Sequence, residues 1–241
     1  MPIDYWFPLA IYYTDLENAQ TENQRLKKTI LELEELSGVE RKNTRSTAWT
    51  GDVHGFGQIH FDERFRWIVE NVESSCFEYM TELGIDLTMV TPYIQRSWPI
   101  ICRHDEVVSI HAHHNANISA VYYVDIPISD EESDVGPIVF HNMHNQNEVQ
   151  KGMSTESTSA IANWNETNIK SCVYIPTPGR LVLFPSKQHH SVGPNLTKCV
   201  RISLSFDIAL VAAETVSPDT YEFLLPPPQQ WKPFDQNPLH P

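Results

Sequence analysis

The sequence predicts an α+β protein in which two helices in the first third of the chain support a jelly-roll of short strands. Apolar residues recur at helical spacing in residues 16–36 and again in residues 62–83. From Leu87 onward the pattern changes to short extended runs that are rich in Val, Ile and aromatic residues. Turn residues separate these runs about every 8–12 residues, which is typical of a β-sandwich or barrel.

Local signals mark the ends of both predicted helices. Thr14 offers an N-terminal cap for the helix over residues 16–36, and Gly38 follows the end of that helix. The helix over residues 62–83 ends directly before Gly84. Neither helix places carboxylates at catalytic spacing, so we expect both to serve as scaffold.

The expected core is a series of strands within residues 87–210. These strands are expected at residues 89–101, 107–111, 118–126, 136–140, 172–175, 180–184 and 200–207, with a short edge strand within residues 3–13. Prolines within residues 89–101 favour an edge position for that segment. The pattern predicts one domain over residues 1–241, with mostly helical support in residues 1–86.

Two segments lack a regular period. The polar stretch His141–Ser171 is long for a loop inside a compact domain, and such loops are usually functional, so we expect a lid over the site. The proline-rich tail 211–241 is expected to be extended, whether it wraps the domain, makes contacts or is disordered.

Composition excludes several classes of partner. The net charge is −14, from 17 Lys and Arg against 31 Asp and Glu, which disfavours nucleic acid and anionic membranes. No apolar run approaches the roughly 20 residues that span a bilayer, and the N-terminus lacks the basic region of a signal peptide. The four cysteines are scattered without CxxC spacing, which argues against a zinc site and a disulfide framework. We expect a soluble cytoplasmic protein.

The strongest chemical signal is a cluster of histidines before a buried strand. In an extended chain His111 and His113 lie on one face and His114 lies on the other. Two imidazoles at this spacing form half of a site for a metal such as iron, and His190, after a strand that ends at Pro185, is the best candidate for the third ligand. The alternative is solvent-exposed or hydrogen-bonded histidine, since the chain contains 11 histidines.

A second signal is a polar face on the strand at residues 200–207. Arg201, Ser203 and Ser205 alternate there with apolar residues. A buried arginine requires an anionic partner, and a guanidinium with a neighbouring hydroxyl can bind a carboxylate. An internal ion pair with one of the many acidic residues is an equally good interpretation.

Several short motifs between about residues 95 and 207 add to these signals. They are Trp98, HxHxNAxISxVYYV from His111, GPIVF from Gly136, PxPGRLVLFPS from Pro176, HSVxPN from His190 and RISxSF from Arg201. In combination they resemble the iron(II)/2-oxoglutarate-dependent oxygenases with an HxH…H arrangement, and the fold of that family is the double-stranded β-helix.

The resemblance implies cofactors and roles for individual residues. It implies Fe(II) bound by His111 and His190, and 2-oxoglutarate held at its distal carboxylate by Arg201 and Ser203. Tyr122 is a further candidate for contact with the co-substrate. For substrate contacts the candidates are Asn115, Trp98 and Trp164.

One position departs from the family pattern. His113 stands where the usual His-x-Asp/Glu…His triad has a carboxylate. It could complete a three-histidine centre, the position could be vacant and filled by water or halide, or the pair could be shifted to His113 and Asn115. We favour His111 and His113 as joint ligands because they share a face.

The expected activity is that of a 2-oxoglutarate-dependent non-haem iron dioxygenase. The expected reaction hydroxylates an unactivated C–H bond of a small polar metabolite, an amino acid or a peptide side chain, with molecular oxygen consumed and succinate and CO2 released. The alternatives are a non-catalytic cupin-like module for metal or ligand binding and a 2-oxoglutarate-independent three-histidine dioxygenase. A protein-interaction role is weaker, since only the acidic surface and the tail suggest it.

Overall fold

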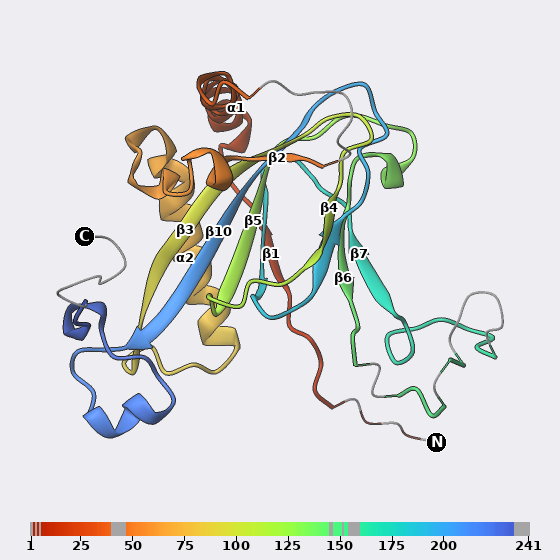
Figure 1. The fold of residues 1–241 in the computed structure, drawn as a ribbon. Helices are drawn as coiled ribbons and strands as arrows, with labels where there is room; N and C mark the ends of the chain where they lie inside the picture. The colour runs from red at the N-terminus through yellow and green to blue at the C-terminus, as the bar shows by residue number, and fades with distance from the viewer. Residues whose placement is uncertain are drawn as a thin grey trace, which may run out of the picture.

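Two antiparallel β-sheets face each other in the computed structural model (Figure 1). The structure describes residues 2, 4, 6–39, 47–144, 147–150, 152–153 and 160–233. The larger sheet has six strands in the order β1-β8-β5-β10-β3-β2, and the smaller has four in the order β4-β9-β6-β7. The predicted α+β class with a jelly-roll core is thereby confirmed.

The helices and strands have the following bounds. They are β1 Tyr12–Asp15, α1 Ala19–Leu36, β2 Trp49–Thr50, α2 Arg66–Glu82, β3 Val90–Cys102, β4 Val108–His111, β5 Ile118–Asp125, β6 Ile138–His141, β7 Ser171–Tyr174, β8 Arg180–Pro185, β9 His190–Val192 and β10 Arg201–Ala212. Short 3-10 helices lie at Gly51–His54, Ile59–Phe61, Glu63–Phe65, Glu132–Asp134, Pro218–Glu222 and Pro228–Gln230.

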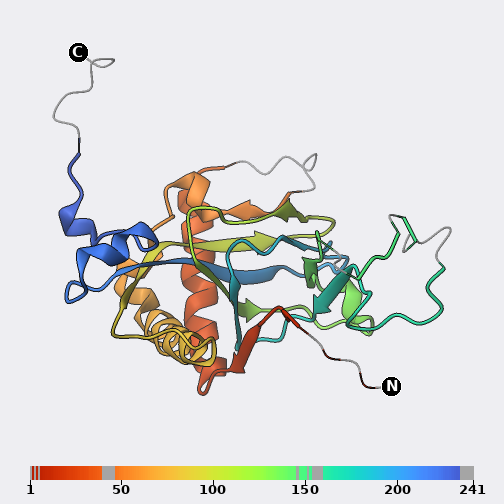
Figure 2. The same cartoon turned by 90° about the horizontal axis from the view of Figure 1, so that it is seen from below.

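Both long helices pack on the outer face of the six-stranded sheet, away from the smaller sheet (Figures 1 and 2). Ile30 of α1 and Ile68 of α2 are fully buried in one cluster with Leu204 of β10. Burial of apolar surface of this kind is the main stabilising contribution to such a fold. The helices therefore support the six-stranded sheet on the face opposite the smaller sheet, as expected of a scaffold.

The opposite face of the same sheet points toward the smaller sheet. Val121 and Tyr123 of β5 and Phe184 of β8 pack there against Ile138 and Phe140 of β6. Side chains alternate between the two faces of a strand. Neighbouring residues of one strand consequently belong to different layers, and only the inner layer can reach a site between the sheets.

Two element boundaries differ from the expectation. Thr14 does not cap a helix, because residues 12–15 form β1 and pair with β8 at the edge of the larger sheet. The chain turns at Asn18, which has a φ of 59°, and α1 starts at Ala19 instead of residue 16. The strand expected at residues 89–101 is the single strand β3, Val90–Cys102, although its neighbour β2 pairs only with Ile100 and Ile101. The edge-like position of β3 leaves room for its prolines.

The described parts of the long loop and of the tail also differ from the expectation. None of the described residues of the loop between β6 and β7 lines the central cavity, so the structure does not support the expected lid. The tail is not simply extended, because it contains short 3-10 helices and the N–H of Ala212 donates to the carbonyl of Leu225 at 2.8 Å. Residues 234–241 of the predicted tail lie outside the described residues. The single-domain extent over 1–241 stays a prediction.

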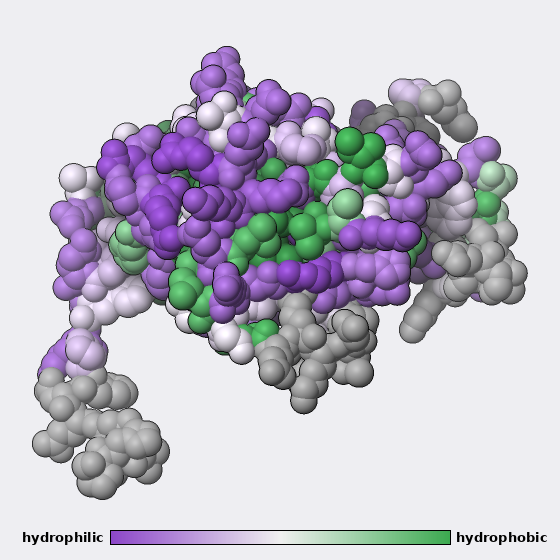
Figure 3. Space-filling model, turned by 90° about the horizontal axis from the view of Figure 1, so that it is seen from above, coloured by the Kyte–Doolittle hydropathy of each residue, from purple (hydrophilic) through white to green (hydrophobic). Residues whose placement is uncertain are grey.

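One face of the surface is mostly polar (Figure 3). The face shown in Figure 3 is mostly hydrophilic, with a patch of hydrophobic residues near its centre. Among the described residues, no helix combines the length and apolar character needed to cross a bilayer.

Candidate metal centre

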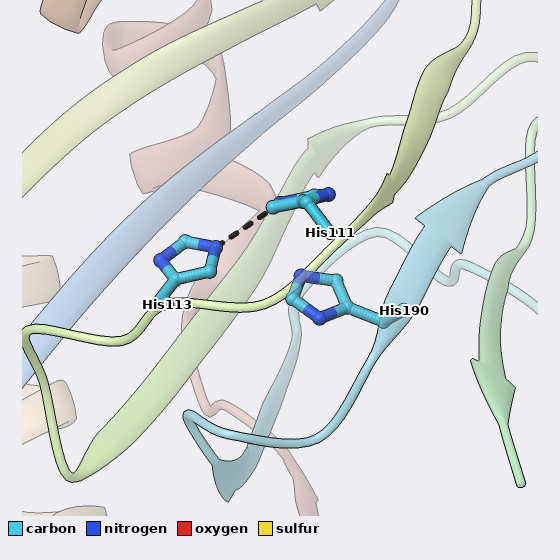
Figure 4. Close-up of side chains that lie close together, drawn as sticks. All are labelled: His111, His113 and His190. Carbon is cyan, nitrogen blue, oxygen red and sulfur yellow. Dashed lines mark hydrogen bonds between the residues drawn. The ribbon is translucent and has the colours of Figure 1, made fainter. Parts of the chain in front are cut away.

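Three histidines converge between the two sheets. His111 at the end of β4 lies directly opposite His190 at the start of β9 in the antiparallel register. His113 follows two residues later and turns its ring toward the same point (Figure 4). One ring nitrogen from each residue lies within 4.8 Å of the others, and the Nε2 atoms of His111 and His113 are 3.1 Å apart.

Each of the three rings has a defined partner at Nδ1. Nδ1 of His111 lies 2.8 Å from the carbonyl oxygen of Ser109, and Nδ1 of His190 lies 2.9 Å from that of Gln188. Nδ1 of His113 lies 2.5 Å from Oδ1 of Asp207. Carbonyl and carboxylate oxygens accept hydrogen bonds, so each Nδ1 donates, which leaves Nε2 as the nitrogen that can bind a metal in each neutral ring.

This tautomer is the one that a metal ion requires. The Nε2 atoms of His111 and His113 lie 3.1 Å apart, so one can donate to the other when it carries a proton. A metal ion held between the rings would take the place of that proton. Ligating histidines elsewhere have the same outer hydrogen bonds to carbonyls or carboxylates. The cluster therefore fits a divalent metal with nitrogen ligands.

Burial keeps two of the rings neutral. Desolvation, together with a smaller effect of the neighbouring imidazoles, lowers the pKa of His190 to about 3, although the bond to Gln188 opposes the shift. Desolvation likewise lowers the pKa of His111. A neutral imidazole can bind a metal, whereas a protonated one cannot. Both rings are therefore ready to bind at neutral pH.

Arg201 lines the cavity that also contains the three histidines, and it has no acidic partner among the described residues. Its side chain is 1% exposed, its Nη1 donates to Ser203 Oγ at 3.3 Å, and its Nε has no hydrogen-bond partner. The buried hydroxyl of Tyr123, whose ring lies 5.3 Å from the guanidinium carbon, also lacks a partner. Unsatisfied buried donors of this kind require an explanation, and an anionic ligand provides one. Among the described residues, Arg201 therefore has no internal ion pair of the kind that the sequence left open.

One glycine makes room for this arginine. Gly136 has a φ of 69°, and a Cβ there would lie 3.1 Å from Cδ of Arg201 and 3.2 Å from the carbonyl oxygen of Gly193. Any other residue would combine an unfavourable backbone conformation with a contact against the buried arginine.

A single cavity joins the histidines to the arginine. Its volume is about 530 Å³. All three histidines line it, as do Arg201 and Ser203. A ligand that reaches both groups would span from the metal to the guanidinium.

The remaining predicted residues divide between the cavity and other places. Trp98 lines the cavity and stacks on His113, with ring centroids 5.7 Å apart, and Asn115 lines it too. Trp164 is half exposed and does not line the cavity, so its predicted contact with substrate is not supported.

Tyr122 was expected to contact the co-substrate, and the structure contradicts this. Its hydroxyl donates to Asn23 Oδ1 of α1 at 2.6 Å, on the outer face of the sheet. The next residue, Tyr123, has the inner position because side chains alternate along β5.

The sequence analysis also missed a polar row across the inner face of the larger sheet. Ser119 of β5 and Arg96 of β3 flank Asp207 of β10 in register. Arg96 donates to Asp52 at 2.5 Å, and its guanidinium lies over the ring of Trp98. The alternation of Arg201, Ser203 and Ser205 continues to residue 207, so Asp207 could have been found from the sequence.

Comparisons with known proteins agree with this geometry. Residues 96–207 match the model of a family described as "Putative 2OG-Fe(II) oxygenase". The match covers just under half of the chain and makes these residues similar to the 2OG-Fe(II) oxygenases. Together with the three-histidine cluster, it supports the predicted 2-oxoglutarate-dependent iron(II) oxygenase with Fe(II) and 2-oxoglutarate as cofactors. No curated protein sequence matches the chain significantly.

Solved structures share the fold of this oxygenase at low sequence identity. The carbocyclase SnoK from nogalamycin biosynthesis is 11% identical, with a TM-score of 0.56 over 90% of this chain and 87% of SnoK. A prolyl-4-hydroxylase from Pseudomonas putida is 14% identical, with a TM-score of 0.52 over 83% and 92% of the two chains. HygX from Streptomyces hygroscopicus, solved with nickel and 2-oxoglutarate, is 11% identical, with a TM-score of 0.51 over 83% of each chain. These likenesses confirm the double-stranded β-helix fold.

Proposed function

We propose that this oxygenase hydroxylates an unactivated C–H bond of a small polar metabolite, an amino acid or a peptide side chain. One equivalent each of 2-oxoglutarate and dioxygen would be consumed, and the hydroxylated product, succinate and CO2 would be released. The observation that carries the proposal is that one cavity contains both a three-histidine cluster and a buried arginine without an acidic partner.

His111, His113 and His190 are proposed as the iron ligands. The 3.1 Å separation of two Nε2 atoms and the donation by all three Nδ1 atoms support His113 over a vacant position or a pair shifted to Asn115. Iron(II), when bound, supplies the activation of dioxygen that is coupled to the decarboxylation of 2-oxoglutarate. The contribution of the chain is to hold the rings: Trp98 packs flat against His113 at an interplanar angle of 18°.

Arg201, Ser203 and Tyr123 are proposed to hold the distal carboxylate of 2-oxoglutarate. The guanidinium has a free Nε, and Tyr123 has a free hydroxyl beside it. A carboxylate placed there would accept hydrogen bonds from both groups and balance a buried positive charge. Tyr123 takes the place that the sequence suggested for Tyr122.

The rest of the cavity is proposed to bind the substrate. The part near Trp98 and Asn115 also contains Arg96 and Asp52, so its lining is polar and carries both signs of charge. A volume of about 530 Å³ lies in the range of small-molecule sites and leaves space for 2-oxoglutarate together with a small substrate. Apolar residues such as Phe184 and Val192 line the remaining wall and would exclude water.

The partners are proposed to be a small molecule or peptide and dioxygen. That the enzyme acts in the cytoplasm, without nucleic acid or a membrane, stays a prediction from its net charge of −14.

Product analysis tests the reaction class. Protein loaded with Fe(II) and 2-oxoglutarate labelled at C1 is exposed to dioxygen, and labelled CO2 and succinate are measured in a single turnover. We expect both products in equal amounts from the wild type and little from Arg201→Ala. Arg25→Ala, at a side chain that is 70% exposed, is the matched control and should behave as the wild type. Consumption of oxygen without succinate would instead support the 2-oxoglutarate-independent dioxygenase.

A further inference from the structure

The proposed three-histidine centre lacks the anionic ligand of the usual two-histidine, one-carboxylate triad. The carboxylate of Asp207 lies behind the His113 ring, where it contacts Nδ1 on the side opposite Nε2. We propose that Asp207 is a positioning residue that holds His113 in its metal-binding tautomer and supplies the missing negative charge through the imidazole. This inference rests on the proposed role of His113 as a ligand.

The contact between the two side chains is short and buried. Asp207 Oδ1 lies 2.5 Å from Nδ1 of His113, and the side chains are 4% and 13% exposed. Charge-assisted hydrogen bonds are shorter and stronger than neutral ones, and they gain further strength away from water. Asp207 therefore determines which nitrogen of His113 carries the proton.

The sheet fixes where this carboxylate lies. Asp207 is on β10, the strand between β3 and β5, opposite Arg96 on one side and Ser119 on the other. Ser119 Oγ donates to Asp207 Oδ1 at 3.4 Å, and Arg96 Nη1 lies 3.7 Å from Oδ2. A residue held by pairing on both edges cannot easily move toward the metal, so Asp207 acts through His113 and does not replace it.

The charges around Asp207 do not cancel. Arg96 is the only cation among the described residues that pairs with Asp207, and it lies closer to Asp52, at 2.5 Å. Two carboxylates therefore share one guanidinium, which leaves one net negative charge beside His113. A carboxylate hydrogen-bonded to a ligating histidine makes the ring a better donor to the metal. The three-histidine centre thus regains the charge that it lacks relative to the usual triad.

Two substitutions separate the charge from the hydrogen bond. Asp207→Asn keeps the shape and an oxygen that can accept from Nδ1, but it removes the charge. Asp207→Ala removes both. Asp15→Asn is the matched control, because it removes a carboxylate that pairs with an arginine, Arg180, at the surface without touching a histidine. Circular dichroism and a melting curve establish that each variant is folded.

The first readout is the dissociation constant of Co(II), measured by competition with a chelator and without turnover. We expect about 10- to 100-fold weaker binding for Asp207→Ala, with Asp207→Asn weaker than the wild type by a smaller factor. Asp15→Asn should bind as the wild type does. Unchanged affinity in both Asp207 variants, or an equal loss in Asp15→Asn, would overturn the inference.

The second readout identifies the ligands. Proton NMR of the Co(II) protein should show three exchangeable, paramagnetically shifted imidazole N–H signals, one for each Nδ1. We expect Asp207→Asn to move the His113 signal and to accelerate its exchange with solvent, while the other two stay in place. Only two signals in the wild type would mean that His113 is not a ligand, and both the proposed centre and this inference would fail. Three signals that Asp207→Asn leaves unmoved would contradict the inference alone.

Discussion

Arg201→Met removes the guanidinium that is proposed to hold 2-oxoglutarate and keeps most of the side-chain volume. In the wild type this group is buried with a free Nε and no carboxylate partner among the described residues. Loss of a charge-assisted, two-point contact with a buried carboxylate costs about 3–4 kcal/mol. At 1.4 kcal/mol for each factor of ten, the dissociation constant of 2-oxoglutarate should rise about 10²- to 10³-fold.

The same substitution should not weaken the ligand-free fold. An unpaired buried charge is unfavourable, and replacing buried ionic groups with apolar ones of similar volume is often neutral or stabilising by about 1–4 kcal/mol. The free energy of unfolding of Arg201→Met, measured by urea denaturation without 2-oxoglutarate, should therefore equal or exceed that of the wild type. This opposite response of binding and stability distinguishes a ligand-binding arginine from a structural one.

The assay is a titration with 2-oxoglutarate of anaerobic protein that contains Fe(II), followed by visible absorption. Arg180→Met is the matched control, because Arg180 pairs with Asp15 at the surface at 2.8 Å. It should leave 2-oxoglutarate affinity unchanged and cost about 0–1 kcal/mol of stability. Unchanged affinity in Arg201→Met, or a loss of several kcal/mol of stability in the ligand-free protein, would refute the assigned role of Arg201.

Three further predictions follow from the buried groups. Tyr123→Phe should weaken 2-oxoglutarate binding by about 0.5–1.5 kcal/mol. Tyr122→Phe should leave binding unchanged but lower the free energy of unfolding by a similar amount, because it loses the hydrogen bond to Asn23. The reverse pattern would contradict the assignment of the inner and outer faces of β5. Burial raises the pKa of Cys76 to about 11, so the thiol's contribution to the free energy of unfolding is complete below its unfolded pKa near 9 and is lost as the pH rises through 11. Urea unfolding at pH 8 and at pH 11 should show this loss of stability. Cys76→Ala should lose less stability between the two pH values. Co(II) at 100 times its dissociation constant should stabilise the wild type by about 2.7 kcal/mol in thermal unfolding. The same Co(II) concentration should stabilise His111→Ala far less, and equal stabilisation would contradict His111 as a ligand.

Local patterns in the sequence were sufficient to find the histidines and the arginine. The spacing of His111 and His113 in an extended segment puts both rings on one side, and the structure brings their Nε2 atoms to 3.1 Å. The alternation of polar and apolar residues along residues 200–207 likewise predicted the inward face of β10 that contains Arg201. Both inferences depended only on the period of a strand.

The error at Tyr122 has a specific cause. β5 is buried on both faces, and Ser119 is the one small polar residue in its interior, so its sequence has no repeated alternation that would tell the inner face from the outer one. The inner and outer positions of β5 cannot be counted from His113 either, because residues 112–117 are not part of a strand. Only the packing of Tyr122 against α1 and of Tyr123 near Arg201 assigns the two faces.

Other features depended on contacts between distant residues. Thr14 and Asp15 have the composition of a helix cap, but pairing with β8, more than 160 residues away, makes them a strand. The contact of Asp207 with His113 joins residues 94 positions apart. The position of the loop between β6 and β7 depends on tertiary structure as well, and its polar composition alone could not place it over or beside the cavity.

The most direct test of a three-histidine iron site that binds 2-oxoglutarate is an anaerobic titration with Fe(II) and then 2-oxoglutarate. A visible charge-transfer band should appear in the wild type and in His114→Ala, where the exposed neighbouring histidine is removed. The band should be absent or strongly weakened in His113→Ala. A wild type that binds iron without developing the band would contradict chelation by 2-oxoglutarate, and an unchanged band in His113→Ala would contradict a third histidine ligand.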